Sequence, residues 1–210
     1  MRKFPSTAAK KLRIFKKLSS PARIQNFLDT LPINFEEGGR TCRSPLSVLK
    51  KGEAHCLEGA MLAAAALWFH GERPLLLDLR SVYRDDDHVV TLFRHAGRWG
   101  AISKTNHAVL RYREPVYKNV RELAMSYFHE YFMDDGVKTL RTHSTPFNLL
   151  RYDASWLTDG KDVHYVAEDL DDSPHLELIS ENSIRRLRRA DGIEIKVGKI
   201  VEWKKNRHLA

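Results

Sequence analysis

Cys56, one of only two cysteines in the sequence, stands where a cysteine can act as a nucleophile. It directly precedes the stretch Leu57–Phe69, which is rich in alanine and leucine and is interrupted by Glu58 and Gly59. If this stretch is a helix, the free N–H groups and the dipole at its start favour a thiolate over a thiol. The alternative is that Cys56 is a small apolar residue of the core, since free cysteine is among the most buried residue types.

A nucleophilic cysteine needs a base within hydrogen-bond reach, and His88, 32 residues further along, is the candidate. His88 begins the strand pattern of Val89–Phe93, and a second strand pattern, Trp99–Ser103, follows after Ala96-Gly97. Two hairpin registers remain open: one places Ser103 directly opposite His88, and the other places it diagonally across the two strands. In both registers the two side chains share a face, because side chains alternate along a strand. The chain has ten histidines, most of which must be surface or packing residues, so the pairing with Cys56 is a prediction.

A buried helix and a sheet must position these residues. The helix expected over Leu57–Phe69 is apolar nearly all round, which indicates burial on all sides, and Gly71 ends it. Pro74 then opens a strand pattern over Leu75–Val82, so a buried helix is followed by three strands. We therefore predict an α+β fold in which the helix packs on an antiparallel sheet. Further elements are expected as a helix over 22–31, an amphipathic helix over 120–132, a short basic helix over 184–189 and one or two strands over 192–203.

Four pieces of this region, in their order and spacing, resemble the transglutaminase-like superfamily, a papain-like group of cysteine-nucleophile proteins. They are Gly52-Glu-Ala-His-Cys56-Leu-Glu-Gly-Ala60, Gly71-Glu-Arg-Pro74, Asp87-His88-Val-Val and Trp99-Gly-Ala-Ile-Ser103. The first piece is two residues longer than the Gly-x-Cys segment of the family. The resemblance implies a papain/transglutaminase-like core with N-terminal helices over 20–135. A basic arm over 1–19 would precede this core, and an extension over 136–210 would pack on it within the same domain.

The resemblance also implies a catalytic set of Cys56 as nucleophile, His88 as base and Ser103 as the third residue. The family usually has an aspartate in that third position, and a neutral hydroxyl cannot stabilise a protonated imidazole as a carboxylate does. In serine triads, loss of the orienting charge costs about 10⁴ in turnover. Cysteine–histidine pairs tolerate a neutral third residue better, and papain-like enzymes use an asparagine there. Asn106 and Asp87 are alternative orienting residues, although strand alternation turns Asn106 away from His88.

Other residues near the candidate nucleophile have open roles. An oxyanion hole is expected to use the backbone N–H of Cys56, with a second donor from the 41–55 loop or from Gln25. His55 either raises the local positive potential, lines the substrate cleft, or is an ordinary loop residue. The turn Asp85–Asp87 either binds a cation or is simply a solvated acidic turn.

These observations lead to two functional hypotheses. The first is a cysteine-dependent acyl-transfer enzyme, namely a peptidase, an amidase or a transglutaminase-like transferase, acting on a peptide or amide substrate through a thioester. The second is a catalytically inactive transglutaminase-like binding module, whose basic termini contact nucleic acid, an anionic surface or a partner protein.

The net charge of +8 belongs to the two ends of the chain. Residues 1–17 contain seven Lys/Arg and no acidic residue, and residues 181–210 contain nine Lys/Arg and four acidic residues, which leaves a net charge of −4 for residues 18–180. Basic ends either keep a small protein soluble or contact RNA, DNA or anionic lipid. Residues 1–17 and 185–207 are the segments predicted to make such contacts.

Several classes of protein are not indicated by the sequence. No Gly-rich phosphate loop, dinucleotide fingerprint or zinc pattern is present, so we expect neither a cofactor nor a metal. The longest apolar run, Leu57–Phe69, is too short to cross a bilayer, and the basic N-terminus lacks the apolar segment of a secretory signal. Two cysteines form no disulfide framework, which makes a reducing compartment and a cytoplasmic location the expectation.

Overall fold

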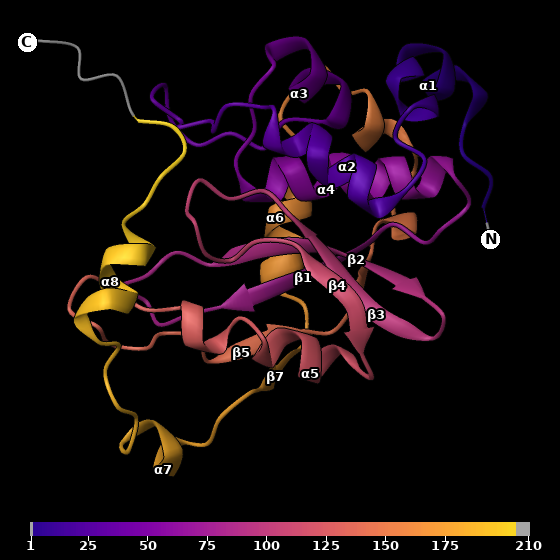
Figure 1. The fold of residues 1–210 in the computed structure, drawn as a ribbon. Coiled ribbons are helices and arrows are strands. Elements are labelled where there is room, and N and C mark those ends of the chain that lie inside the picture. Colours follow the sequence, from indigo (N-terminus) through magenta and orange to yellow (C-terminus); the bar gives the residue numbers. More distant parts are fainter. Residues whose placement is uncertain (1, 205–210) are drawn as a thin grey trace, which may run out of the picture.

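A computed structural model describes residues 2–204 and shows an α+β fold built on one antiparallel sheet of seven strands (Figure 1). Six strands follow the order β4-β3-β2-β1-β5-β7, and β6 also pairs with β1. The strands are β1 (Leu75–Arg80), β2 (His88–His95), β3 (Arg98–Ser103), β4 (Arg113–Tyr117), β5 (Thr142–Ser144), β6 (Phe147–Asn148) and β7 (His175–Glu177). The predicted antiparallel sheet is therefore confirmed.

The buried helix is α4 (Cys56–Phe69), and it packs against β1, β2 and β3. All residues from Leu57 to Trp68 are buried, because helices α2 (Pro21–Asp29) and α3 (Pro45–Lys51) also pack against α4 (Figure 1). The prediction of a helix enclosed on all sides is confirmed. No helix within residues 2–204 combines the length and the hydrophobicity that crossing a bilayer requires.

The hairpin of β2 and β3 adopts the second of the two registers that the sequence left open. Val90 lies opposite Ser103, and Phe93 lies opposite Gly100. His88 is therefore diagonal to Ser103, with both side chains on one face of the sheet. Ala96 (φ +46°) and Gly97 (φ +78°) both have left-handed backbone conformations, as a two-residue hairpin turn requires.

The N-terminal residues form two short helices, α1 (Ser6–Lys11) and η1 (Arg13–Lys16), on the outer side of α4. The apolar side chains of residues 4–18 join the core, whereas the basic side chains of this segment point to solvent. Phe4, for example, makes edge-on contacts with Trp68 and Phe69 at centroid distances of 5.1 and 5.3 Å. The buried members of this group are Ala8, Leu12, Phe15 and Leu18.

The predicted elements of the second half of the chain are partly wrong. The helix expected over 120–132 is divided into α5 (Val120–Met125) and η2 (Phe128–Glu130). The basic helix expected over 184–189 lies earlier, as α7 (Glu181–Ile184). Residues 205–207 of the predicted contact segment are outside the described residues.

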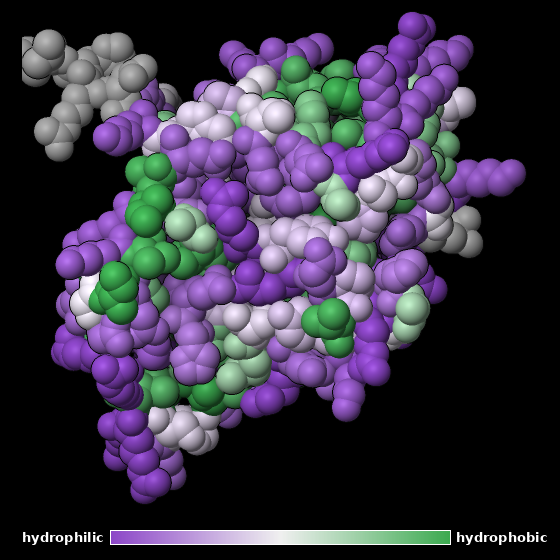
Figure 2. Space-filling view, in the orientation of Figure 1, coloured by the Kyte–Doolittle hydropathy of each residue, from purple (hydrophilic) through white to green (hydrophobic). Residues whose placement is uncertain are grey.

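The strands expected over 192–203 are also wrong, because the chain forms helix α8 (Gly192–Gly198) there. Asp191 accepts hydrogen bonds from the N–H groups of Ile193 and Glu194, and Glu194 accepts one from the N–H of Asp191. This reciprocal capping box begins a helix that the alternation of apolar residues alone does not indicate. Figure 2 shows apolar side chains gathered at the surface near α8, where Ile193, Val197 and Ile200 are exposed.

The extension over 136–210 supplies the remaining strands of the sheet. One edge of β1 pairs with β2, and its other edge pairs with β5 and β6. Leu79 lies opposite His143 in β5, and Leu75 lies opposite Asn148 in β6. Helix α6 (His164–Asp171) adds Val166 and Leu170 to the core that contains α4.

Candidate active site

Cys56 is the first residue of α4 and lies in a cleft of about 610 Å³ between the helix and the acidic turn before β2. The helix begins at this point because His55 has an extended backbone and Glu58 caps it, with its carboxylate accepting a hydrogen bond from the His55 N–H at 3.2 Å. The thiol therefore lies at the positive end of a fourteen-residue helix. Residues lining the cleft include His55, Cys56, Asp86, His88, Lys104 and Tyr131.

The structure brings His88 and Ser103 into direct contact beside this thiol. The Nε2 atom of His88 lies 2.8 Å from the hydroxyl oxygen of Ser103, and both side chains are buried. The Ser103 hydroxyl donates its single proton to the carbonyl of Leu110 at 2.6 Å. It can therefore only accept from His88, so Nε2 carries a proton in both charge states of the ring, and Nδ1 is the atom that exchanges the second proton.

The thiol of Cys56 contacts two imidazoles, those of His55 and His88. Since Nε2 of His88 is bonded to Ser103, Nδ1 is the ring atom left to face the sulfur. Burial by itself raises the pKa of the thiol, but the hydrogen bonds and charges of the two imidazoles outweigh burial and lower the pKa of Cys56 to about 5. At neutral pH the sulfur is therefore a thiolate, the form that acts as a nucleophile.

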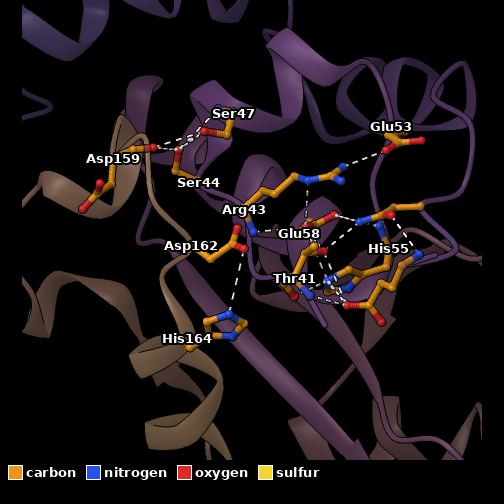
Figure 3. A network of polar contacts seen from close by, with 12 residues as sticks. Thr41, Arg43, Ser44, Ser47, Glu53, His55, Glu58, Asp159, Asp162 and His164 are labelled. Atoms are coloured by element: carbon orange, nitrogen blue, oxygen red, sulfur yellow. Dashed lines mark hydrogen bonds and ion pairs between the residues drawn. The ribbon is translucent and has the colours of Figure 1, made fainter. Parts of the chain in front are cut away.

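His55 is held by a buried polar network around Glu58 (Figure 3). The carboxylate of Glu58 is fully buried and accepts hydrogen bonds from the Thr41 hydroxyl at 2.8 Å and from the Asn34 amide at 3.1 Å. It also accepts one from the backbone N–H of Arg43 at 3.0 Å. These donors come from the 33–44 segment, so the network fixes that segment against the start of α4.

The alternative residues that the sequence offered for the site have other partners. Gln25 donates to the Ser103 carbonyl at 2.8 Å and accepts from the Ser103 N–H at 2.9 Å, so it holds the end of β3 and is not an oxyanion donor. Asn106 makes a two-way contact with the backbone of Trp203. The carboxylate of Asp87 accepts from the Ser81 N–H at 2.7 Å. Ser103 is thus the residue that orients His88.

Lys104 is a buried cation of the same cleft that sequence reasoning missed. Its ammonium group donates to the carbonyl of Leu31 and lies 4.2 Å from the ring centroid of Trp203. Its stem passes over Gly59, one turn after Cys56, where a methyl group would come within 2.5 Å of the Lys104 Cβ. Burial lowers the pKa of Lys104 to about 8.

The acidic turn does not form a metal site by itself. Among residues 2–204, one group of three potential ligands gathers its oxygen atoms, and it consists of Asp78, Asp87 and Asp171. The guanidinium of Arg80 lies among them, 3.8, 3.7 and 3.1 Å from the respective carboxylates. This group already contains a cation, so we assign no metal to it.

Neither known family models nor curated protein sequences match this chain. The resemblance to the transglutaminase-like superfamily therefore stays a prediction from four short sequence pieces.

Proposed function

We propose that this protein is a cysteine-dependent acyl-transfer enzyme that acts on an amide bond through a thioester. The observation that supports this best is the contact of the Cys56 thiol with His88, whose far nitrogen is fixed by Ser103. A nucleophile, a base and an orienting group in hydrogen-bond contact form the arrangement that covalent catalysis requires.

The proposed reaction uses the two ring nitrogens of His88 differently. The Cys56 thiolate attacks the carbonyl carbon, and the backbone N–H at the start of α4 stabilises the oxyanion. The protonated Nδ1 of His88 gives its proton to the leaving nitrogen, the C–N bond breaks, and a thioester forms. Nδ1 then takes a proton from water or from an acceptor amine, which attacks the thioester and releases the thiolate. Nε2 keeps its proton throughout, because Ser103 is an acceptor for it.

A chromogenic ester tests the chemistry without knowledge of the natural substrate. With p-nitrophenyl acetate, attack by Cys56 expels p-nitrophenolate, which needs no proton, whereas hydrolysis of the acetyl thioester needs His88 as base. Wild-type protein should show a burst of p-nitrophenolate followed by turnover, and Cys56→Ala should show neither. His88→Gln should retain the burst and accumulate acetylated protein, with deacylation slowed by about 10²–10⁴.

The matched control is His164→Gln, which removes another histidine–carboxylate contact, 3.9 Å to Asp162, outside the residues that line the cleft. It should leave burst and turnover unchanged. Absence of a Cys56 acetyl adduct in the wild type would contradict the proposal. Deacylation of His88→Gln at the wild-type rate would contradict the assigned role of His88.

The second hypothesis, a binding module with basic termini, is favoured by one observation at the N-terminus. All seven basic side chains of residues 2–17 are exposed, and none of them forms an ion pair with a carboxylate within the described residues. At the other end of the chain Arg188 and Arg189 pair with Asp191 and Asp135 at 3.6 and 3.9 Å. Helices α1 and α7 lie at opposite ends of the molecule (Figure 1), so the arginines that follow α7 do not share a surface with the lysines of α1.

A salt titration tests this second function. If α1 and η1 contact four phosphates of a nucleic acid, raising salt from 50 to 200 mM should weaken binding by about 150-fold, from a slope of about 0.9 per phosphate. Replacing Lys10, Lys11, Lys16 and Lys17 by glutamine should abolish the binding, and replacing Arg185 and Arg186 should not. Absence of binding at 50 mM salt would exclude nucleic acid as the partner.

A further inference from the structure

Within residues 2–204, His88 forms no hydrogen bond or ion pair with a carboxylate. His88 contacts Ser103, and Ser103 passes its proton to the carbonyl of Leu110, so the chain of hydrogen bonds behind the imidazole is neutral throughout. A neutral chain of hydrogen bonds orients the imidazole but does little to stabilise a positive charge on it. The thiolate of Cys56 therefore needs a second source of positive charge.

His55, the residue before the nucleophile, faces hydrogen-bond acceptors on one side. Its Nε2 atom lies 3.0 Å from the carbonyl of Thr41, 3.5 Å from a carboxylate oxygen of Glu58 and 3.8 Å from one of Glu36. An atom among three acceptors keeps its proton. The other ring nitrogen is then the one available to contact the Cys56 sulfur, and it can do so as a donor when the ring is protonated.

The carboxylates beside His55 are held in place by the fold. Glu58 has no exposed surface and receives four hydrogen bonds, so its carboxylate is fixed one turn after Cys56 on the same helix. Arg43 partly offsets its charge, with Nε at 3.8 Å, but the Arg43 guanidinium also pairs with Glu53 at 2.9 Å. Glu36 adds a second carboxylate, 3.8 Å from Nε2 of His55.

We propose that His55, supported by Glu58 and Glu36, is a positioning residue that holds the Cys56 thiolate, which leaves His88 free to exchange protons with the substrate. This inference rests on the proposed function and assigns a separate task to each of the two imidazoles. The transglutaminase-like superfamily usually has an aspartate behind the histidine base. Here the negative charge lies behind His55 and comes from the carboxylates of Glu58 and Glu36.

The electrostatic environment supports this assignment. Burial by itself lowers the pKa of His55, but its contact with Cys56, the charge of Glu58 and the Thr41 carbonyl raise it to about 9. The groups that face the thiol are His55 and His88, and Tyr131 lies nearby with its hydroxyl bonded to the Asp86 carbonyl. Lys104 and the turn Asp85–Asp87 line the same cleft. Over the range between about pH 5 and 9 the site thus contains a thiolate and a protonated His55.

The test is the pH dependence of Cys56 alkylation by iodoacetamide, measured by mass spectrometry on the full chain. Its midpoint reports the thiol pKa and does not depend on turnover. The limiting alkylation rate at high pH is a poorer measure of the thiol pKa, because a thiolate of low pKa is also a weaker nucleophile. Wild-type protein should have a midpoint near pH 5. His55→Gln should raise the midpoint by about two units or more toward the ordinary value of about 8.5, and His88→Gln should raise it less.

Glu36→Gln provides a second variant with little risk to folding, since this side chain is about one third exposed and the amide oxygen can still accept from the Thr41 N–H. It should raise the midpoint by a smaller amount, and His164→Gln should not change it. Thermal unfolding of each variant identifies any that is not folded, in which case Glu36→Gln decides alone.

The outcomes separate the two proposals. A wild-type midpoint near 8.5 would refute the activated nucleophile itself, and with it the proposed function. A low wild-type midpoint that is unchanged in His55→Gln, or unchanged in Glu36→Gln where His55→Gln is not folded, would refute the role of His55 and leave the proposed function intact.

Discussion

Gly59 lies at the closest approach between α4 and the end of β3, and its replacement by alanine should damage both stability and catalysis. A Cβ atom at this position would lie 2.5 Å from Cβ and 2.9 Å from Cγ of Lys104. Ordinary carbon–carbon contacts are about 3.5–4.0 Å. Because Cβ is fixed by the backbone, the overlap can be relieved only by moving the chain at Lys104, next to Ser103.

The expected magnitude follows from two opposing effects. Overpacking of a close contact costs about 1–3 kcal/mol, and the upper value applies here because no flexible side-chain end can yield. Alanine in place of glycine in a helix returns about 1 kcal/mol. The free energy of unfolding should therefore fall by about 2 kcal/mol, which for a chain of this size lowers Tm by about 4–8 °C.

The assay combines thermal or denaturant unfolding with the deacylation rate of the acetyl-enzyme. Movement of Ser103 lengthens its contact with Nε2 of His88, so deacylation of Gly59→Ala should be slower than in the wild type. Gly38→Ala is the control, because no atom lies within 4 Å of a methyl group placed there. If Gly59→Ala is as stable as the wild type while Gly38→Ala is also unchanged, the close approach of Lys104 is not as described.

Three further substitutions test other contacts. Asn106→Ala removes both hydrogen bonds to the Trp203 backbone, at 2.9 and 3.0 Å, and should speed hydrogen exchange of the Trp203 amide without lowering global stability by more than about 1–3 kcal/mol. Thr91→Val removes a buried 2.5 Å hydrogen bond from β2 to a carbonyl of α4 and should cost about 1 kcal/mol in denaturant unfolding, and no loss would contradict the contact. The hydrogen bond that His175 donates to the Asp78 carboxylate raises the pKa of His175, so the protonated form stabilises the fold below the unfolded pKa of about 6.5, and this stabilisation is lost as pH rises through the folded value. The difference in Tm between wild type and His175→Gln should then be larger near pH 6 than near pH 9, and a constant difference would refute this linkage.

The parts of the fold that could be predicted from sequence are those set by local patterns. The run Leu57–Phe69 can only be enclosed, because it has no polar face, and Gly71 marks its end. The hairpin followed from two apolar runs around Ala96-Gly97, and the diagonal placement of Ser103 was one of only two registers that this turn allows.

The parts that could not be predicted depend on contacts between distant segments. Gln25 was considered as an oxyanion donor, but its position against Ser103 is fixed by the packing of α2 on β3. The acceptors around His55 come from the 33–44 segment, whose path has no periodic pattern.

Two helix starts nevertheless have a local signal in the sequence. A glutamate three residues after His55 has the spacing of a capping residue, and Asp191 and Glu194 have the same spacing at the start of α8.

Because both edges of β1 are paired, folding of the sheet depends on the order in which its strands are synthesised. Its second edge is covered by β5 and β6, which are synthesised long after β2 and β3. Until they emerge from the ribosome, Leu75, Leu77 and Leu79 belong to a strand with open hydrogen-bonding groups, which is a template for aggregation. A fragment ending near residue 135 contains Cys56, His88 and Ser103 but lacks β5 and β6, so it should aggregate when expressed alone. Residues 136–210 would then protect the open edge of β1.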